Sequence, residues 1–140
     1  MATPQEIAQQ LIDDFNDRTY AQNAASYFSP DCVNVDLPTG QELYGIEGAV
    51  QSTDVWVQAF PNAYADVVSH DVQGNTVTST IRASGTFDGQ MMLPDGTVIP
   101  GNGSPLDMDY QQTITVENGM VVRVEANYDM QAMLGQLGLG

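Results

Sequence analysis

The first part of the chain carries its apolar side chains at the spacing of a helix. Residues 3–6 have the form of a capping box with proline at the first helical position. Ile7, Leu11 and Phe15 then follow four residues apart. Because side chains at this spacing lie on one helical face, the pattern predicts an N-terminal helix with one buried stripe.

Two more helices and a strand are predicted in the next 45 residues. A helix from about residue 20 to 28 ends near Pro30, which opposes its continuation. Residues 32–37 are typical of a strand. The next helix runs from about residue 46 to 60 and ends before Pro61.

From residue 64 the pattern alternates with the period of a strand. Gly74-Asn75 and Asn118-Gly119 have the form of two-residue hairpin turns. Helices followed by a meander of strands favour an α+β fold, in which a curved antiparallel sheet wraps around the N-terminal helices. We expect residues 1–140 to form a single domain.

Counting outward from Gly74-Asn75 separates the two faces of the first hairpin. His70 falls on the core face opposite Ser79, as a partly buried, hydrogen-bonded histidine, with a catalytic histidine as the alternative. Arg82 falls on the solvent face. The other side chains predicted to face the core are Tyr64, Val68, Val72, Val77, Ile81 and Ala83.

The second hairpin has one face that becomes polar toward its end. Spacing alone leaves open whether this polar row faces solvent or a pocket, and a bulge near the turn would shift the register by one residue. A carboxylate at the mouth of an apolar pocket can act as a general acid or base because burial raises its pKa. The polar face comprises Tyr110, Gln112, Glu125, Asn127 and Asp129, and the opposite face Val122, Val124, Ala126 and Tyr128.

The charge balance excludes several classes of partner. Eighteen acidic residues against three arginines give a net charge of -15, which argues against nucleic acid and anionic membranes. One cysteine and one histidine supply no zinc-like ligand set, so we expect no metal. The chain starts without a signal-peptide pattern and has no long apolar window, which predicts a cytoplasmic protein.

Short motifs occur in a fixed order along nearly the whole chain. They are Phe15-Asn16, Ser29-Pro30-Asp31, Ala59-Phe60-Pro61-Asn62, Gly74-Asn75-Thr76-Val77, Gly85-Thr86, Asn118-Gly119, Asp129 and Gln136-Leu137-Gly138. In this order and spacing the sequence resembles the SnoaL-like polyketide cyclase family. The resemblance implies a fold similar to nuclear transport factor 2, with a cone of helices and bent sheet enclosing a pocket, in a homodimer or higher homo-oligomer.

The resemblance also implies a reaction. In the cyclases of the family, the aspartate before the final short helix is the acid/base group for intramolecular aldol closure of a polyketide ester, without metal or cofactor. Asp129 matches that position, so the resemblance implies that Glu125, Asn127 and Asp129 face the cavity. The apolar face of the hairpin would then be outermost and covered by an oligomer partner. Two positions depart from the family, where Phe87 replaces a histidine and Glu125 a tryptophan.

Together with these residues, the resemblance implies a cofactor-independent enzyme acting on a small hydrophobic carbonyl compound. Asp129 would remove a proton next to the carbonyl, while Tyr110 and Asn127 donate hydrogen bonds to the developing oxyanion. Glu125 would raise a carboxyl pKa by like-charge repulsion, or would pair with Arg123 instead. The further substrate-binding candidates are Glu125, Gln112, Asn34, Trp56, Phe15 and Met91.

Three points stay open at this level. A noncatalytic module that binds a small hydrophobic ligand is the main alternative, and an epoxide hydrolase-like enzyme is another, although Arg82 and Arg123 are poorly placed to supply its arginine. Asn34 and Asp36 alternate on the first strand and line either the pocket or the surface. Residues 87–105 form either a lid or a plain surface loop.

Overall fold

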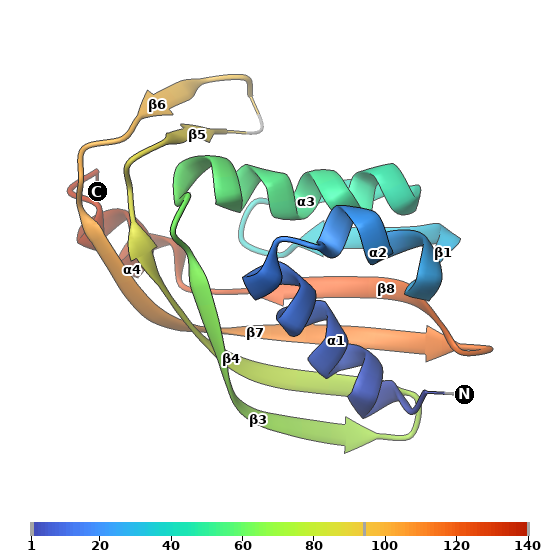
Figure 1. Ribbon diagram of the computed structural model, residues 1–140. Helices are drawn as coiled ribbons and strands as arrows, with labels where there is room; N and C mark the ends of the chain where they lie inside the picture. The colour runs from blue at the N-terminus through green and yellow to red at the C-terminus, as the bar shows by residue number, and fades with distance from the viewer. Residues whose placement is uncertain (1, 94, 140) are drawn as a thin grey trace.

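The computed structural model describes residues 2–93 and 95–139. An open, curved sheet packs helices against its concave side (Figure 1). The helices are α1 (Pro4–Asp17), α2 (Tyr20–Tyr27), α3 (Gly45–Ala59) and α4 (Met130–Gln136). The strands are β1 (Phe28–Asp36), β2 (Gln41–Tyr44), β3 (Tyr64–Gln73), β4 (Thr76–Thr86), β5 (Gln90–Met92), β6 (Val98–Pro100), β7 (Pro105–Glu117) and β8 (Met120–Asn127).

The N-terminal helices form where the sequence predicts them. The capping box is confirmed, because Glu6 N donates to Thr3 Oγ1 at 3.2 Å and Thr3 N donates to Glu6 Oε1 at 2.9 Å. α1 ends at Arg18, whose backbone is left-handed with φ of 59°. α2 and α3 each lie within one residue of their predicted bounds. No helix in the described part of the chain is both long and apolar enough to span a membrane.

The main sheet has the order β2-β1-β8-β7-β4-β3. Its pairs are antiparallel except β1 and β8, which run parallel, so the predicted α+β class with a curved antiparallel sheet is confirmed with one parallel pair. Figure 1 shows α1 crossing the strands at the β3 and β4 side, while α3 lies over β1. The second sheet is the short β5–β6 hairpin.

A β-bulge at Val68 makes part of the predicted first hairpin wrong. His70 pairs with Ser79 and Val72 with Val77, as the turn predicts, but Val67 pairs with Ile81, so Val68 is one residue too many on its strand. The extra residue reverses the inward and outward positions beyond it. Tyr64 and Val68 are therefore 51% and 61% exposed, while Ala65 is buried.

A second bulge changes the face of the C-terminal strand. Val116 pairs with Val121, but Thr115 pairs with Arg123, so Val122 is the extra residue of β8. Beyond Val122 the even-numbered side chains of the strand face the cavity, in place of the odd-numbered ones. The predicted inward position of Glu125, Asn127 and Asp129 is thus wrong, and so is the outermost position of Val124, Ala126 and Tyr128.

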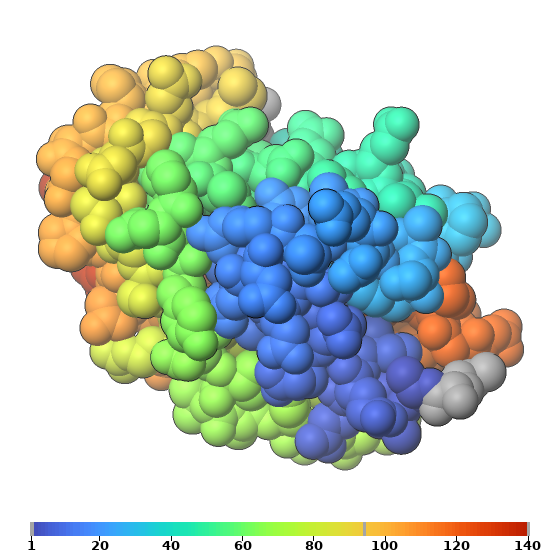
Figure 2. Space-filling model, in the orientation of Figure 1, coloured from blue at the N-terminus to red at the C-terminus, as the bar shows by residue number. Residues whose placement is uncertain are grey.

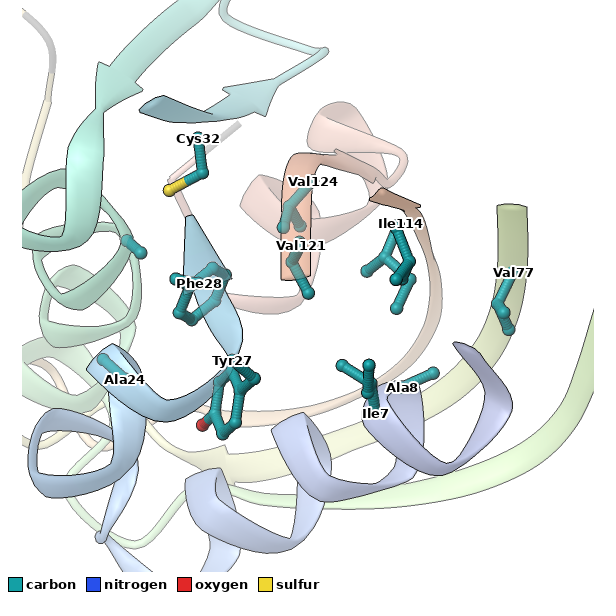
Figure 3. Close-up of a cluster of buried hydrophobic side chains, with 12 residues drawn as sticks. Ile7, Ala8, Ala24, Tyr27, Phe28, Cys32, Val77, Ile114, Val121 and Val124 are labelled. Carbon is teal, nitrogen blue, oxygen red and sulfur yellow. The ribbon is translucent and has the colours of Figure 1, made fainter. Parts of the chain in front are cut away.

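The largest core cluster confirms this reversal. Figure 3 shows Val124 and Ile114 pointing into the same space as Ile7 and Phe28. Ile114 has no exposed surface and Val124 is 7% exposed. α1 and α2 cover this side of the molecule in the space-filling view (Figure 2). The oligomer interface that was expected on the Val124 face therefore loses its structural basis.

Residues 87–105 contain the β5–β6 hairpin rather than an irregular loop. Phe87 and Met91 are buried in one cluster with Phe60 at the end of α3. The hairpin is also held by its backbone, since Gly89 N donates to Ala59 O at 3.1 Å. It forms part of the wall over the interior (Figure 1).

Candidate functional site

A mostly apolar cavity of about 240 Å³ lies between the concave face of the sheet, the helices and the β5–β6 hairpin. This volume is close to the lower end of the range of about 300–1,000 Å³ that ligand pockets usually have. The sequence-predicted candidates Phe15, Trp56, Met91, Tyr110, Gln112 and Asn34 all line it. The cavity is therefore suited to a compact ligand.

Three polar side chains lie along the sheet floor of the cavity. On β1, Asn34 and Asp36 face it two residues apart, and on β7 Gln112 does so. Asp36 and Gln112 both pair with Ala126 of β8, which lies between their strands. Since neighbouring strands are about 4.8 Å apart, Asp36 and Gln112 flank a gap about 10 Å wide over the small Ala126 side chain.

Each of these three side chains has a buried atom without a hydrogen-bond partner. Among the described residues these atoms are Asn34 Nδ2, Asp36 Oδ1 and Gln112 Nε2. Asn34 is only 8% exposed. Because buried polar atoms in native proteins are nearly always paired, three unpaired atoms around one cavity are candidate contacts for the polar groups of a ligand.

The second carboxylate oxygen of Asp36 is held in place. Tyr128 OH donates to Asp36 Oδ2 at 3.0 Å. The Tyr128 ring meets Trp56 edge to face at a centroid distance of 5.4 Å, and Trp56 in turn stacks on Phe60. These contacts fix the tyrosine and leave Asp36 Oδ1 free for a ligand.

The pKa of the Asp36 carboxyl is shifted upward. Burial raises its pKa above the ordinary aspartate value, while hydrogen bonds from Tyr128 and Thr39 oppose the rise. Burial and the neighbouring Asp36 carboxylate also raise the pKa of Tyr128, so this hydroxyl stays protonated as a donor. Burial likewise raises the pKa of Tyr110.

Asp129 lies elsewhere. Its Oδ1 accepts a hydrogen bond from Ala132 N at 3.0 Å as the N-cap of α4, and the residue is exposed. With Asn127 it borders an open groove on the outer face of the sheet, beside Asp109 and Gln111. Glu125 is on that face too, 3.3 Å from Arg123, as the alternative interpretation held. The Val122 bulge is the physical reason for all three positions.

His70 and Arg82 also lie outside the cavity. His70 is the partly buried, paired histidine of the prediction, with Nδ1 2.7 Å from Ser79 Oγ and Nε2 3.0 Å from Gln9 Oε1. Arg82 binds Asp107 on the outer face, as predicted. Within residues 2–93 and 95–139, no three His, Cys, Asp or Glu side chains are grouped so that they could hold a metal ion.

Sequence reasoning noted Asp36 but did not choose its face, and it missed Tyr128 and Ser52. Ser52 Oγ lies 3.5 Å from Asn34 Oδ1 on the helix side of the cavity. The alternation of Asn34 and Asp36 along one strand was the available signal. Tyr128 carried no such signal, because the bulge had reversed its assigned face.

An open curved sheet around an apolar cavity defines the ketosteroid isomerase-like class of folds, also called nuclear transport factor 2-like. The family model for the SnoaL-like polyketide cyclases matches residues 6–137. The chain therefore belongs to that family. No functionally curated protein matches the sequence.

Solved structures with this fold are similar over nearly the whole chain. A proposed SnoaL-like polyketide cyclase from Jannaschia sp. CCS1 is 21% identical with a TM-score of 0.87, covering 98% of this chain and 92% of its own. IdmH, a proposed polyketide cyclase from Streptomyces antibioticus, is 23% identical with a TM-score of 0.78 and coverages of 98% and 99%. A protein of ketosteroid isomerase-like fold from Catenulispora acidiphila, solved with trimethylamine, is 17% identical with a TM-score of 0.78 and coverages of 99% and 96%. These similarities show the fold.

Proposed function

We propose that the protein is a cofactor-independent acid/base enzyme that acts on a small, neutral, hydrophobic carbonyl compound. The observation that carries this proposal is the group of unpaired polar atoms, two amide donors and one carboxylate oxygen, at the floor of an apolar cavity. Membership of the SnoaL-like family supports intramolecular aldol cyclisation of a polyketide ester as the reaction.

The cavity lining favours a neutral substrate. Among its described residues, Asp36 is the only carboxylate and none is basic. An anionic substrate would find no countercharge there, and the net charge of -15 would repel it further. The apolar walls favour a ligand with few polar groups, and the volume favours a compact one.

The polar groups fit enolate chemistry. A base removes the proton next to a carbonyl, and the electron pair moves onto the carbonyl oxygen, where amide donors stabilise the charge. In a cyclisation the enolate carbon then attacks a second carbonyl of the same molecule, a carbon–carbon bond forms, and the new alkoxide takes up the proton. An epoxide hydrolase-like site would need an arginine, which the described lining residues do not include.

Exchange of substrate protons for deuterium tests this function without knowledge of the natural product. We expect the protein to catalyse exchange next to the carbonyl in some members of a panel of small ketones and 1,3-dicarbonyl esters, followed by NMR in D₂O. Ala126→Phe places a ring over the floor between Asp36 and Gln112 and should abolish both exchange and binding. Ala25→Phe, on the exposed side of α2, is the matched control and should leave both intact.

The same experiment separates the alternatives. Binding without exchange would identify a noncatalytic binding module. Exchange at an undiminished rate in a folded Ala126→Phe variant would contradict the cavity as the site. Folding of both variants is checked by circular dichroism and thermal unfolding. Gel filtration with light scattering measures the predicted homodimer or higher homo-oligomer.

A further inference from the structure

The Asp36 side chain is partly buried, and its fully buried carboxylate oxygen is an unfavourable feature for the fold alone. Its Oδ1 atom has no partner, and no basic side chain is among the described residues lining the cavity. A buried carboxylate without a countercharge destabilises the folded protein, and is expected where chemistry requires it. The unpaired amide nitrogens of Asn34 and Gln112 also destabilise the fold, and they too are expected only where they have a function.

The positions of these groups relative to one another are defined by the sheet. Asn34 and Asp36 point the same way because they are two residues apart on β1. Gln112 occupies the same row as Asp36, on the far side of Ala126. A flat molecule lying over Ala126 would meet a carboxylate oxygen at one edge and an amide donor at the opposite edge.

Resting on the proposed function, we propose that Asp36 is the general base of the reaction and that the amides of Asn34 and Gln112 bind two separate oxygen atoms of the substrate. The substrate class is then a compound with two neutral oxygen acceptors flanking an acidic carbon–hydrogen bond, such as a 1,3-dicarbonyl compound. Asp129 is excluded from this role by its position on the outer face of the sheet.

The proton and electrons balance in this arrangement. Asp36 Oδ1 takes the proton from the carbon between the two carbonyls, and the bonding pair moves onto an oxygen that an amide N–H holds. The enolate carbon bonds to the carbon of a further carbonyl group in the same molecule, the π bond of that carbonyl breaks onto its oxygen, and this oxygen takes the proton back from Asp36. The carboxyl returns to its starting state.

Tyr128 acts through Asp36 as a positioning residue. Its hydroxyl binds Oδ2 and so directs Oδ1 toward the cavity. This hydrogen bond also lowers the pKa of Asp36 against the effect of burial. Tyr128→Phe should therefore move the acidic limb of the pH–rate profile to higher pH, which a purely structural role would not do.

Asp36→Asn and Asp129→Asn provide a matched comparison. Asp36→Asn should reduce deuterium exchange of a 1,3-dicarbonyl ester by about 10²–10⁴-fold, the usual contribution of a general base, while binding is retained. Asp129→Asn should keep the wild-type rate, because asparagine caps a helix as well as aspartate does. Gln112→Leu should lose about 10²-fold in kcat for the same ester.

The pH dependence identifies the titrating group. Apart from Asp36, the titratable groups among the described lining residues are the tyrosines Tyr20, Tyr64, Tyr110 and Tyr128. α3 presents Trp56 and Ser52 to the cavity, β2 presents Gln41 and β7 presents Gln112, all of which are uncharged. An acidic limb in the wild-type profile therefore belongs to Asp36, and Asp36→Asn should remove it.

Two outcomes would overturn the assignment. One is a folded Asp36→Asn variant with the wild-type exchange rate. The other is loss of exchange in Asp129→Asn with Asp36→Asn unaffected. If Ala126→Phe still abolishes exchange in either case, the proposed function stands and only the identity of the base is wrong.

Discussion

Replacing Asp14 by alanine is expected to destabilise the protein by about 3 kcal/mol, because it leaves several donors at a buried position without their acceptor. Asp14 is 2% exposed. Its carboxylate accepts hydrogen bonds from Tyr27 OH and Thr19 Oγ1 at 2.7 Å, from Asn23 Nδ2 at 2.9 Å and from Gln10 Nε2 at 3.1 Å. These bonds join α1 to α2, and urea unfolding measures their loss.

The neighbouring Asp13 provides the control. It is exposed on the same helix and accepts one bond from Gln9, so Asp13→Ala should change the free energy of unfolding by less than about 0.5 kcal/mol. Equal destabilisation by the two substitutions would contradict the special role of Asp14.

The Asp14 effect has a defined pH dependence. Burial acts to raise the pKa of Asp14, but the four hydrogen bonds outweigh it and the net shift is downward. A carboxyl with a lowered pKa in the folded state stabilises the protein fully above its unfolded pKa of about 3.9. The stability difference between wild type and Asp14→Ala should therefore be constant near neutrality and shrink as the pH falls through the folded pKa. A difference that stays constant down to pH ~2 would contradict this.

Gly89→Ala should destabilise the β5–β6 hairpin by about 3 kcal/mol, the upper end for an overpacked site. A Cβ at position 89 would lie 1.7 Å from the carbonyl oxygen of Gln58 and 2.8 Å from its carbonyl carbon. Because both atoms belong to the α3 backbone, the hairpin must move away. Met91 and Leu93 line the cavity from this hairpin, so ligand binding should weaken as well.

Gly135→Ala is the matched control for Gly89→Ala. Gly135 lies in α4, and a Cβ there would have no neighbour within 4 Å. Alanine is the better helix former by about 1 kcal/mol, so this variant should be as stable as wild type or slightly more stable. Thermal unfolding and hydrogen exchange of the Gly101 amide, which donates to Gly89 O, measure both effects. An unchanged exchange rate of the Gly101 amide in Gly89→Ala would contradict the close packing of Gly89 against the Gln58 carbonyl group.

The sequence predicts the first three helices and the two long hairpins because each has a local cause, whereas β2 and the β5–β6 hairpin were not predicted. The Thr3–Glu6 capping box starts α1. The two turns need residues that tolerate a positive φ, and Gly74, Asn118 and Gly119 adopt φ values of 63°, 53° and 77°. The strand pairing that was predicted close to the first turn is also confirmed, since His70 pairs with Ser79. The predicted faces are wrong beyond Val68 and Val122, where an extra residue enters a strand. Val72 keeps its predicted partner Val77 but is 43% exposed, so its predicted core position is wrong too. A bulge near the second turn was one of the alternatives that the sequence left open, whereas the bulge at Val68 gave no local signal.

The candidate site could be predicted only in part. Gln112 and Tyr110 were placed correctly because the bulge lies on the partner strand, so β7 keeps its register with β4. The depth of Asp36 in the molecule depends on α3 and on Tyr128, which are distant from it in the sequence. Burial and missing hydrogen-bond partners mark the residue in the structure, and neither can be read from alternation.

The extra residue at Val122 has an evolutionary consequence. An extra residue in a bulge has no partner of its own on the neighbouring strand. A relative that lacked the Val122 codon would therefore keep every later pair of β8 with β7, including Ala126 with Gln112. Its residues equivalent to Glu125 and Ala126 would still face outward and inward, although their numbers counted from the turn would have changed parity. A one-residue alignment gap at this point would mark the bulge and leave the lining of the cavity unchanged.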